Sequence, residues 1–361
     1  MEITSYNKEQ LQALLNSSFY KQLDYVPISY IRGLSHVANP YADDDDILLW
    51  VIYAENKLIG YLGALPDKIV ANQKDIKIYW LSCLWIAPNF RGQGIKDKLL
   101  QEAISLYGET IAITNVLYFL EKPYQRLGIF HPTQNNFGTI FYLNPNFSAL
   151  IFAKFPKLSI LKPIYLLSEN IVKAVLKIRK LFYKKVKPTV QIRYNLDADK
   201  ELADFLTEFA PSSNKMVRPI EHFEWIASYP WMQSGNPTAE SKKYYFSSVA
   251  KSFNYISCRL YSNGRLIGFC LLKERDKNLS VCYLYANEED KPIFAKDILN
   301  WSIEQNMDTI FSMDETFTNY LLQNKRKFIY IKKIRRPYLL PKSKNISADI
   351  FQFGDGDVVF T

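Results

Sequence analysis

Leu84-Trp-Ile-Ala-Pro-Asn-Phe-Arg-Gly-Gln-Gly-Ile95 is the stretch that decides the fold, because it joins an apolar strand to a helix through a loop with two glycines. Tyr79 to Ile86 is rich in aromatic and β-branched residues and carries no charge, as expected of a strand buried on both faces. Pro88 ends the strand because proline cannot donate to a sheet ladder. Apolar residues between Ile95 and Leu106 recur at helical spacing up to Gly108, so we expect a helix there.

The loop between this strand and this helix has the chemistry of an anion site. Gly92 and Gly94 permit positive φ and carry no Cβ, so backbone N–H groups can approach phosphate oxygens. The helix that begins near Ile95 adds the positive end of its dipole, and Arg91 and Lys96 add positive charge. The stretch therefore predicts a pyrophosphate-binding loop and an enzyme that uses a nucleotide-bearing cofactor.

This loop resembles motif A of the GNAT N-acyltransferase family, which reads R/Q-x-x-G-x-G/A after a strand and opens the helix that binds the coenzyme A pyrophosphate. Here the run is Asn89-x-x-Gly92-x-Gly94, with asparagine in the first position in place of glutamine or arginine. A second family segment follows in the same order. Residues 111–116 read as the next strand, and Tyr124-Gln-Arg-Leu-Gly-Ile-Phe130 is similar to the family's Y-x-x-L-G-F, with one extra residue before the phenylalanine.

The resemblance implies direct transfer of an acyl group, most often acetyl, from acetyl-coenzyme A to an amine in a ternary complex. Leu84 and Ile86 would offer backbone N–H groups to the thioester carbonyl, and Tyr124 would protonate the departing thiolate. No metal is implied. The cofactor-binding residues implied by the family pattern are Leu84, Trp85, Ile86, Arg91, Gly92, Gln93, Gly94, Ile95, Lys96 and Tyr124.

The general base of such a reaction is not marked in this sequence. The family usually takes it from a carboxylate on or beside the central strand, and residues 78–86 contain none. Glu121 lies just before Tyr124, Asp75 begins the central strand, and His36 lies in the region that the family uses to line the acceptor site. Each is equally readable as a surface or structural residue, and a water chain is a further alternative. The run Asp43-Asp44-Asp45-Asp46 suits either a cationic acceptor or a solvated loop.

An internal repeat indicates the architecture. Tyr53-Ala-Glu-Asn-Lys-Leu-Ile-Gly-Tyr-Leu recurs as Tyr261-Ser-Asn-Gly-Arg-Leu-Ile-Gly-Phe-Cys, and both read as β-hairpins. In the second half a strand over 279–286, a helix over 293–305, a strand over 309–313 and a helix over 317–323 follow the hairpin. We therefore expect an α/β protein with two tandem GNAT-like folds, each a mixed, mostly antiparallel sheet flanked by helices.

The expected domains are a GNAT domain over 1–146, a connector over 147–190 and a second GNAT-like domain over 191–361. The second copy has Ala286-Asn-Glu-Glu-Asp-Lys-Pro292 after its central strand, with three carboxylates and no glycine, so it is not expected to bind coenzyme A. Near the end of the chain, Gly354-Asp-Gly-Asp357 reads as a turn before a last strand over 358–361.

The connector has a composition of its own. Apolar residues recur at helical spacing from Leu161 to Phe182, and the remaining positions carry Lys162, Lys173, Lys177, Arg179, Lys180, Lys184, Lys185 and Lys187. Such a helix can contact an anionic membrane surface through residues 161–187, or it can be an interdomain helix with its lysines in water. No aromatic stacking platform accompanies the basic residues, so nucleic acid is not an expected partner.

Composition restricts the remaining classes. The chain has 361 residues, 48% of them apolar, and a net charge of +9, which suits a two-domain protein with sizeable cores. The four cysteines, Cys83, Cys258, Cys270 and Cys282, lie in strand-like runs without C-x-x-C spacing and read as reduced core thiols. The polar N-terminal segment lacks a signal pattern, so we expect a cytoplasmic protein, with contact to the inner face of the membrane if the basic helix binds lipid.

Three functions fit these observations. The first is an acetyl-coenzyme A dependent N-acetyltransferase acting on a small-molecule amine such as an amino sugar or amino acid. The second is a Fem-type aminoacyl transferase, against which the complete glycine loop argues. The third is a non-catalytic coenzyme A-binding or membrane-associated scaffold, which the missing base and the basic helix favour. The sequence carries no signal for the oligomeric state.

Overall fold

The computed structural model describes residues 2–55, 57–71, 74–145, 163–164, 167, 169–170 and 187–361. The chain forms two compact units, and neither is continuous in sequence. The first unit contains Met1–Asn136, Leu196–Phe253 and Arg335–Thr361, and the second contains Phe137–Asn195 and Asn254–Ile334.

The first unit is built on a mixed sheet. Its strands are β1 (Glu2–Tyr6), β2 (Leu49–Ala54), β3 (Lys57–Ala71), β4 (Lys74–Ile86), β5 (Ile111–Thr114) and the end of β14 (Tyr330–Leu339). Strands β1 to β4 pair antiparallel in sequence order, β4 pairs parallel with β5, and β5 pairs antiparallel with β14. A short parallel pair, β8 (Gln233–Ser234) and β9 (Val249–Ala250), stands apart from this sheet.

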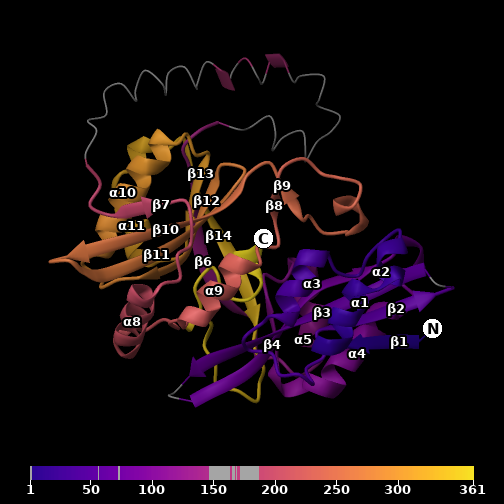
Figure 1. Cartoon of the computed structure of the whole chain (residues 1–361). Coiled ribbons are helices and arrows are strands. Elements are labelled where there is room, and N and C mark those ends of the chain that lie inside the picture. Colours follow the sequence, from indigo (N-terminus) through magenta and orange to yellow (C-terminus); the bar gives the residue numbers. More distant parts are fainter. Residues whose placement is uncertain are drawn as a thin grey trace. The chain divides into compact units, whose positions relative to one another are not determined.

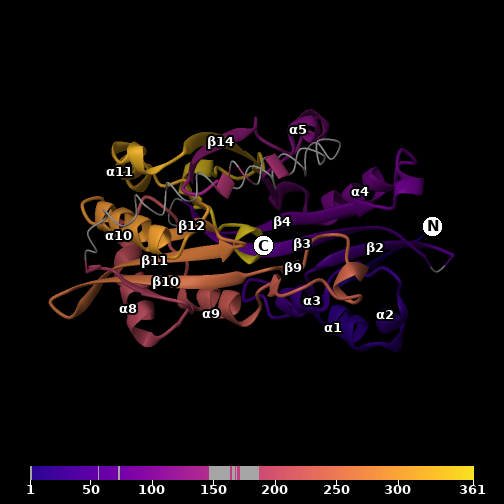
Figure 2. The same ribbon diagram turned by 90° about the horizontal axis from the view of Figure 1, so that it is seen from above.

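Helices cover both faces of strands β2 to β4, as Figure 2 shows. On one face lie α1 (Lys8–Asn16), α2 (Ser18–Gln22) and α3 (Tyr30–Val37), and on the other lie α4 (Ile95–Tyr107) and α5 (Tyr118–Gln125). Each face of the sheet has its own apolar core. Leu11 and Leu15 pack with Tyr61 and Trp85 on the first face, whereas Ile95 of α4 belongs to the core on the second face. Two further helices of this unit are α8 (Lys200–Phe209) and α9 (Ile220–Ser228).

The second unit repeats this order of strand pairing. Its strands are β7 (Gln191–Arg193), β10 (Phe253–Ser262), β11 (Arg265–Arg275), β12 (Asn278–Tyr285), β13 (Thr309–Ser312) and the end of β6 (Gln134–Tyr142). Strand β12 pairs antiparallel with β11 and parallel with β13, and β13 pairs antiparallel with β6. Helices α10 (Lys291–Glu304) and α11 (Glu315–Gln323) lie on one face of this sheet (Figure 1).

The two units exchange strands. Strand β6 begins in the first unit but pairs with β13 in the second, with Phe141 opposite Ile310. Strand β14 begins in the second unit but ends beside β5 in the first, where Tyr338 lies opposite Thr114. The two units therefore alternate along the sequence, and the expected domain ranges 1–146 and 191–361 stay predictions. Most of the expected connector, 147–190, lies outside the described residues.

Most local elements follow the sequence pattern. Asn7 forms a capping box with Gln10 at the start of α1, and Asn263 and Gly264 adopt the positive φ of the expected hairpin turn. The expected last strand over 358–361 was wrong, because Val358–Phe360 forms a 3-10 turn whose three side chains are buried. Among the described residues, no helix is both long and apolar enough to span a membrane.

Short 3-10 turns complete the connections. They are Pro88–Phe90, Gly108–Thr110, Ala210–Ser212, Ser241–Lys243, Lys325–Lys327, Ala348–Ile350 and Val358–Phe360.

Candidate active site

The central strand of the first unit, β4, is interrupted by a bulge. Gly63 lies opposite Ser82 and Tyr61 opposite Trp85, so Cys83 and Leu84 together face the single residue Leu62. Cys83 has a φ of 56°, an uncommon value for a residue with a side chain. Because of this extra residue, the Ser82 and Cys83 side chains both meet groups of the α1–α3 face, where a regular strand would place them on opposite faces.

Beyond the bulge, one edge of β4 has no strand partner among the described residues. Strand β5 pairs with β4 only at Tyr79 and Trp80. The Ala87 N–H donates to the Ile59 carbonyl of β3, so strand alternation directs the backbone groups of Ile86, and likewise Leu84, away from β3 toward the open edge. These are the two residues named as candidate donors to a thioester carbonyl, and their side chains pack on the α4 side.

The glycine loop follows directly and leads into α4. Gly92 and Gly94 have φ values of 80° and 75°, and Gly94 is the N-cap of the helix. No heavy atom lies within 4 Å of a Cβ built on either glycine, so the space above the loop is open. The loop is braced from within, because Arg91 Nε donates to the Ile86 carbonyl at 3.2 Å and Gln93 Nε2 donates to the Asn89 carbonyl at 2.9 Å.

This loop therefore presents free N–H groups at a helix N-terminus to open space. The first N–H groups of an α-helix have no intrahelical acceptor, and here they belong to Ile95, Lys96 and Asp97. Lys96 lies 3.2 Å from the Asp97 carboxylate, which partly offsets its charge. The arrangement fits a pyrophosphate, which needs backbone donors, room for its oxygens and nearby positive charge.

Tyr124 lies in the last turn of α5 and is buried in the same core cluster as Ile95 and Ile113. Burial raises the pKa of Tyr124 to about 12. Its hydroxyl therefore stays protonated at neutral pH and can act as a proton donor.

The three candidate bases from the sequence lie in different surroundings. Glu121 forms a 2.6 Å ion pair with Arg335, and its other oxygen is buried without a hydrogen bond to a described residue. Asp75 is 57% exposed and pairs with Lys68 near the far end of the β3–β4 hairpin. His36 is fully buried, and its burial and the Arg32 guanidinium hold the pKa of His36 well below its usual value.

A polar cluster that the sequence analysis missed lies at the bulge. Arg32 of α3 donates from Nη1 to Cys83 Sγ and from Nη2 to Ser82 Oγ, each at 2.6 Å. Ser82 Oγ in turn donates to Asp357 Oδ2. The sequence predicts only a turn at Asp357, and no local pattern links it to residue 82. Cys83 is half-buried and engaged by Arg32, so it differs from the buried core thiols of the second unit.

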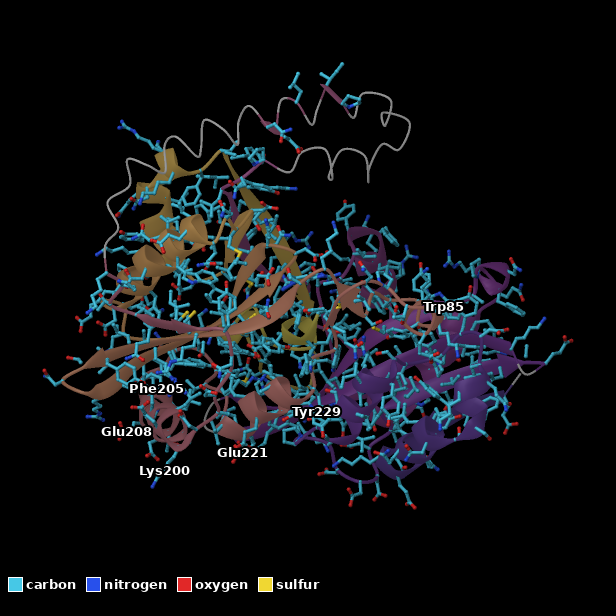
Figure 3. All side chains as sticks on the ribbon, turned by 45° about the horizontal axis from the view of Figure 1, so that its top comes forward. Trp85, Lys200, Phe205, Glu208, Glu221 and Tyr229 are labelled. Carbon is cyan, nitrogen blue, oxygen red and sulfur yellow. The ribbon has the colours of Figure 1, made fainter. Side chains whose placement is uncertain are left out.

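Aromatic rings surround this cluster. Trp231 stacks on Phe360 at 4.6 Å and lies 3.9 Å below the Arg32 guanidinium. Tyr61 stacks on Trp85, labelled in Figure 3, with ring centroids 5.4 Å apart. The indole N–H groups of Trp85 and Trp231 are buried and make no hydrogen bond to a described residue.

The acidic run has a structural role in part. Asp46 is buried, accepts a hydrogen bond from Tyr79 at 2.7 Å and pairs with Lys77 at 2.6 Å, whereas Asp44 is exposed. In the second unit, the segment 286–292 places Lys291 2.6 Å from Glu288 and 2.8 Å from Asp314. Among the described residues, no group of histidine, cysteine, aspartate or glutamate side chains could hold a metal ion.

The first unit has a GNAT-like fold, with a bulged central strand, an open strand edge and a glycine loop at a helix N-terminus. Residues 45–130 match the family described as "Acetyltransferase (GNAT) domain". This part of the first unit is therefore similar to that domain, both in sequence and in fold.

Similarity to known proteins extends to part of the sequence in one case and to the backbone fold in others. Human N-acetyltransferase 8B is 29% identical over 111 residues, which cover 29% of this chain and 48% of that protein, so the chain matches about half of that relative's length. A probable N-acyltransferase from Enterococcus faecalis V583 has a TM-score of 0.51 at 10% identity, covering 94% of this chain and 73% of its own. Saccharomyces cerevisiae N-myristoyltransferase with bound myristoyl-CoA has a TM-score of 0.49 at 12% identity, covering 94% of this chain and 82% of its own.

Proposed function

We propose that this protein is an N-acetyltransferase that moves an acetyl group from acetyl-coenzyme A to an amine of a small molecule. The observation that carries the proposal is the open edge of β4 next to the braced glycine loop, since backbone pairing and phosphate binding are then available on one continuous stretch from Leu84 to Lys96. The proposed acceptor is an amino sugar or an amino acid.

In this proposal the thioester supplies the activated acyl group, and the chain supplies the surroundings of the reaction. The Leu84 and Ile86 N–H groups polarise the thioester carbonyl, and the β4 edge pairs with the pantetheine amides. The acceptor nitrogen forms the new C–N bond as the C–S bond breaks. Tyr124 gives its proton to the departing sulfur, a base takes the proton from the amine, and exchange with solvent restores both groups.

We also propose that the second unit is a GNAT-like fold that no longer binds coenzyme A. Its strand pairing follows the order of the first unit, which supports the tandem arrangement. Its segment 286–292 has no glycine, and Lys291 is engaged by carboxylates, so a phosphate would find neither open backbone nor a free cation there. The expected stoichiometry is one acetyl-coenzyme A per chain.

The test is calorimetric titration with acetyl-coenzyme A of the wild type, Gly92→Glu and Gly264→Glu. Both glycines have positive φ, 80° and 78°, and both have open space around a built Cβ, so the two substitutions impose similar backbone strain. Only Gly92→Glu puts a carboxylate into the proposed phosphate site. We expect one-site binding that Gly92→Glu abolishes and Gly264→Glu preserves.

Turnover separates the remaining functions. Acetylation of a compound in an amine panel supports the proposal, and binding of acetyl-coenzyme A without turnover supports the scaffold function. Absence of binding in the wild type would contradict the proposal and favour an aminoacyl-tRNA donor.

A further inference from the structure

The cluster at the β4 bulge contains a carboxylate that the proposed reaction needs. Asp357 accepts a hydrogen bond from Ser82 Oγ, and its Oδ2 lies 3.8 Å from Arg32 Nη2. Ser82 precedes the bulge directly, two residues before Leu84, whose N–H is a proposed donor to the thioester carbonyl. The carboxylate is thereby held beside the part of the central strand where the acyl group is expected.

Contacts of the residues before and after Asp357 hold its backbone in place. Gly356 has a φ of 76°, and a Cβ on it would lie 2.8 Å from the Thr114 side chain, so the backbone passes close to β5 in a turn that favours glycine. Before the turn, Asp355 is bound to the buried Arg218 at 2.8 Å. After it, Phe360 is fully buried and stacks on Trp231.

Asp357 and Asp355 differ in the solvent exposure of their side chains. The Asp357 side chain is 30% exposed and that of Asp355 is 0% exposed, so only Asp357 can be reached by a molecule from solvent. The other candidate carboxylates are placed less suitably, because the Glu121 side chain is only 13% exposed and Asp75 lies near the opposite end of the hairpin.

We propose that Asp357 is the general base that accepts the proton of the acceptor amine, and that Ser82 and Arg32 are positioning residues that orient its carboxylate. This inference rests on the proposed N-acetyltransferase function. The acceptor nitrogen loses its proton to Asp357 as its lone pair forms the bond to the acyl carbon, and the sulfur leaves with the proton from Tyr124. Products are an amide and free coenzyme A, and Asp357 returns its proton to solvent.

The experiment compares steady-state kinetics of the wild type, Asp357→Asn, Asp357→Glu and Ser82→Ala, with Asp349→Asn as the matched control. Asp349 is exposed and lies in the same C-terminal segment. We expect a loss of kcat of about 100-fold for Asp357→Asn, since general-base catalysis contributes roughly 10²–10⁴-fold. Asp357→Glu should retain part of the activity, and Ser82→Ala should lose less than Asp357→Asn, with the affinity for acetyl-coenzyme A unchanged throughout.

The pH profile adds a readout that a purely structural role would not move. The titratable and charged groups facing the cluster are Arg32 and His36 of α3, Cys83 of β4 and the hydroxyls of Tyr61 and Tyr244. In Asp357→Asn the acidic limb of kcat should disappear while these groups remain. If Asp357→Asn keeps kcat within about twofold of the wild type while Gly92→Glu abolishes activity, the role of Asp357 is refuted and the proposed function stands. If the wild type modifies no amine, the proposed function and the role of Asp357 are both refuted.

Discussion

Arg218 donates hydrogen bonds to both carboxylate oxygens of Asp67, from Nη1 to Oδ1 at 2.5 Å and from Nη2 to Oδ2 at 2.8 Å. The Arg218 and Asp67 side chains are 1% and 6% exposed. Asp355 contacts the same guanidinium, and Trp80 Nε1 donates to Asp67 Oδ2 at 2.8 Å. This buried network joins the β3–β4 hairpin, the segment before α9 and the C-terminal segment within the first unit.

Replacing this guanidinium should destabilise the protein strongly. Arg218→Met leaves two buried carboxylates without their cation, which costs about 3–5 kcal/mol for a broken buried pair. Urea unfolding followed by circular dichroism measures the change. The exposed Arg126→Met should stay within about 0.5 kcal/mol of the wild type. Adding Asp67→Asn to Arg218→Met should recover part of the loss, and strict additivity of the two changes would count against the network.

The stability of the protein should fall in mild acid because of two buried histidines. Burial and a nearby arginine, Arg32 for His36 and Arg218 for His222, hold the pKa of each imidazole well below its usual value. The unfolded chain takes up these protons near pH 6.5 and the native chain does not, so the free energy of unfolding decreases as pH falls below that value. Each histidine contributes up to about 1.4 kcal/mol per pH unit.

Unfolding between pH 7 and 5.5 measures this slope. His36→Leu should remove one histidine's share of the slope, whereas His131→Leu, at a half-buried position, serves as the control. An unchanged slope in His36→Leu would show that His36 is not buried in the neutral form.

Tyr124→Phe should lower kcat by about 100-fold while leaving the affinity for acetyl-coenzyme A intact, because it removes only the proton donor. Tyr118→Phe is the matched control, since Tyr118 lies on the same helix and is 82% exposed. Stopped-flow or steady-state release of free thiol measures both. Equal activity of Tyr124→Phe and Tyr118→Phe would leave Tyr124 with a packing role only.

The positive charge of Lys96, beside the glycine loop, should contribute modestly to the affinity for acetyl-coenzyme A. Lys96→Ala should weaken acetyl-coenzyme A binding by about 0.5–1 kcal/mol, a two- to fivefold rise in Kd, because Lys96 is partly exposed and already close to Asp97. The effect should shrink at high salt. Lys98 follows the three free N–H donors of α4, so Lys98→Ala should raise Kd less than Lys96→Ala. A larger rise in Kd for Lys98→Ala would contradict the proposed position of the phosphate.

Gly138→Ala should destabilise the second unit by about 1–3 kcal/mol. A Cβ at residue 138 would lie 2.2 Å from the Phe311 ring, so β6 cannot pair beside β13 without displacing that ring. Gly108→Ala, whose Cβ would meet ordinary contact at 3.7 Å, is the control. Equal thermal stability of the two variants would argue against the pairing of β6 with β13.

Local patterns predicted what local forces determine. The apolar run into β4, the stop at Pro88 and the helix from Ile95 were all visible, since strand burial, proline geometry and helical spacing act within a few residues. The hairpin at Asn263-Gly264 was visible for the same reason.

Contacts between residues far apart in the sequence could not be predicted from local patterns. Cys83 adopts positive φ although cysteine has no preference for it, so nothing local marked the bulge. Asp357 reaches Ser82 across 275 residues, and Val358–Phe360 looks like a strand because valine and phenylalanine favour sheets. The exchange of β6 and β14 was not predicted either, because the local pattern of a strand does not identify the strand with which it pairs.

The exchange of β14 has a consequence for biosynthesis. The partner of Ile113 is Leu339, so the sheet of the first unit stays unfinished until that part of the chain has left the ribosome. At synthesis rates of about 5–20 residues per second, that wait lasts on the order of ten to forty seconds. During this time β5 has an exposed edge, the kind of surface that chaperones shield and that invites misassembly with other nascent chains.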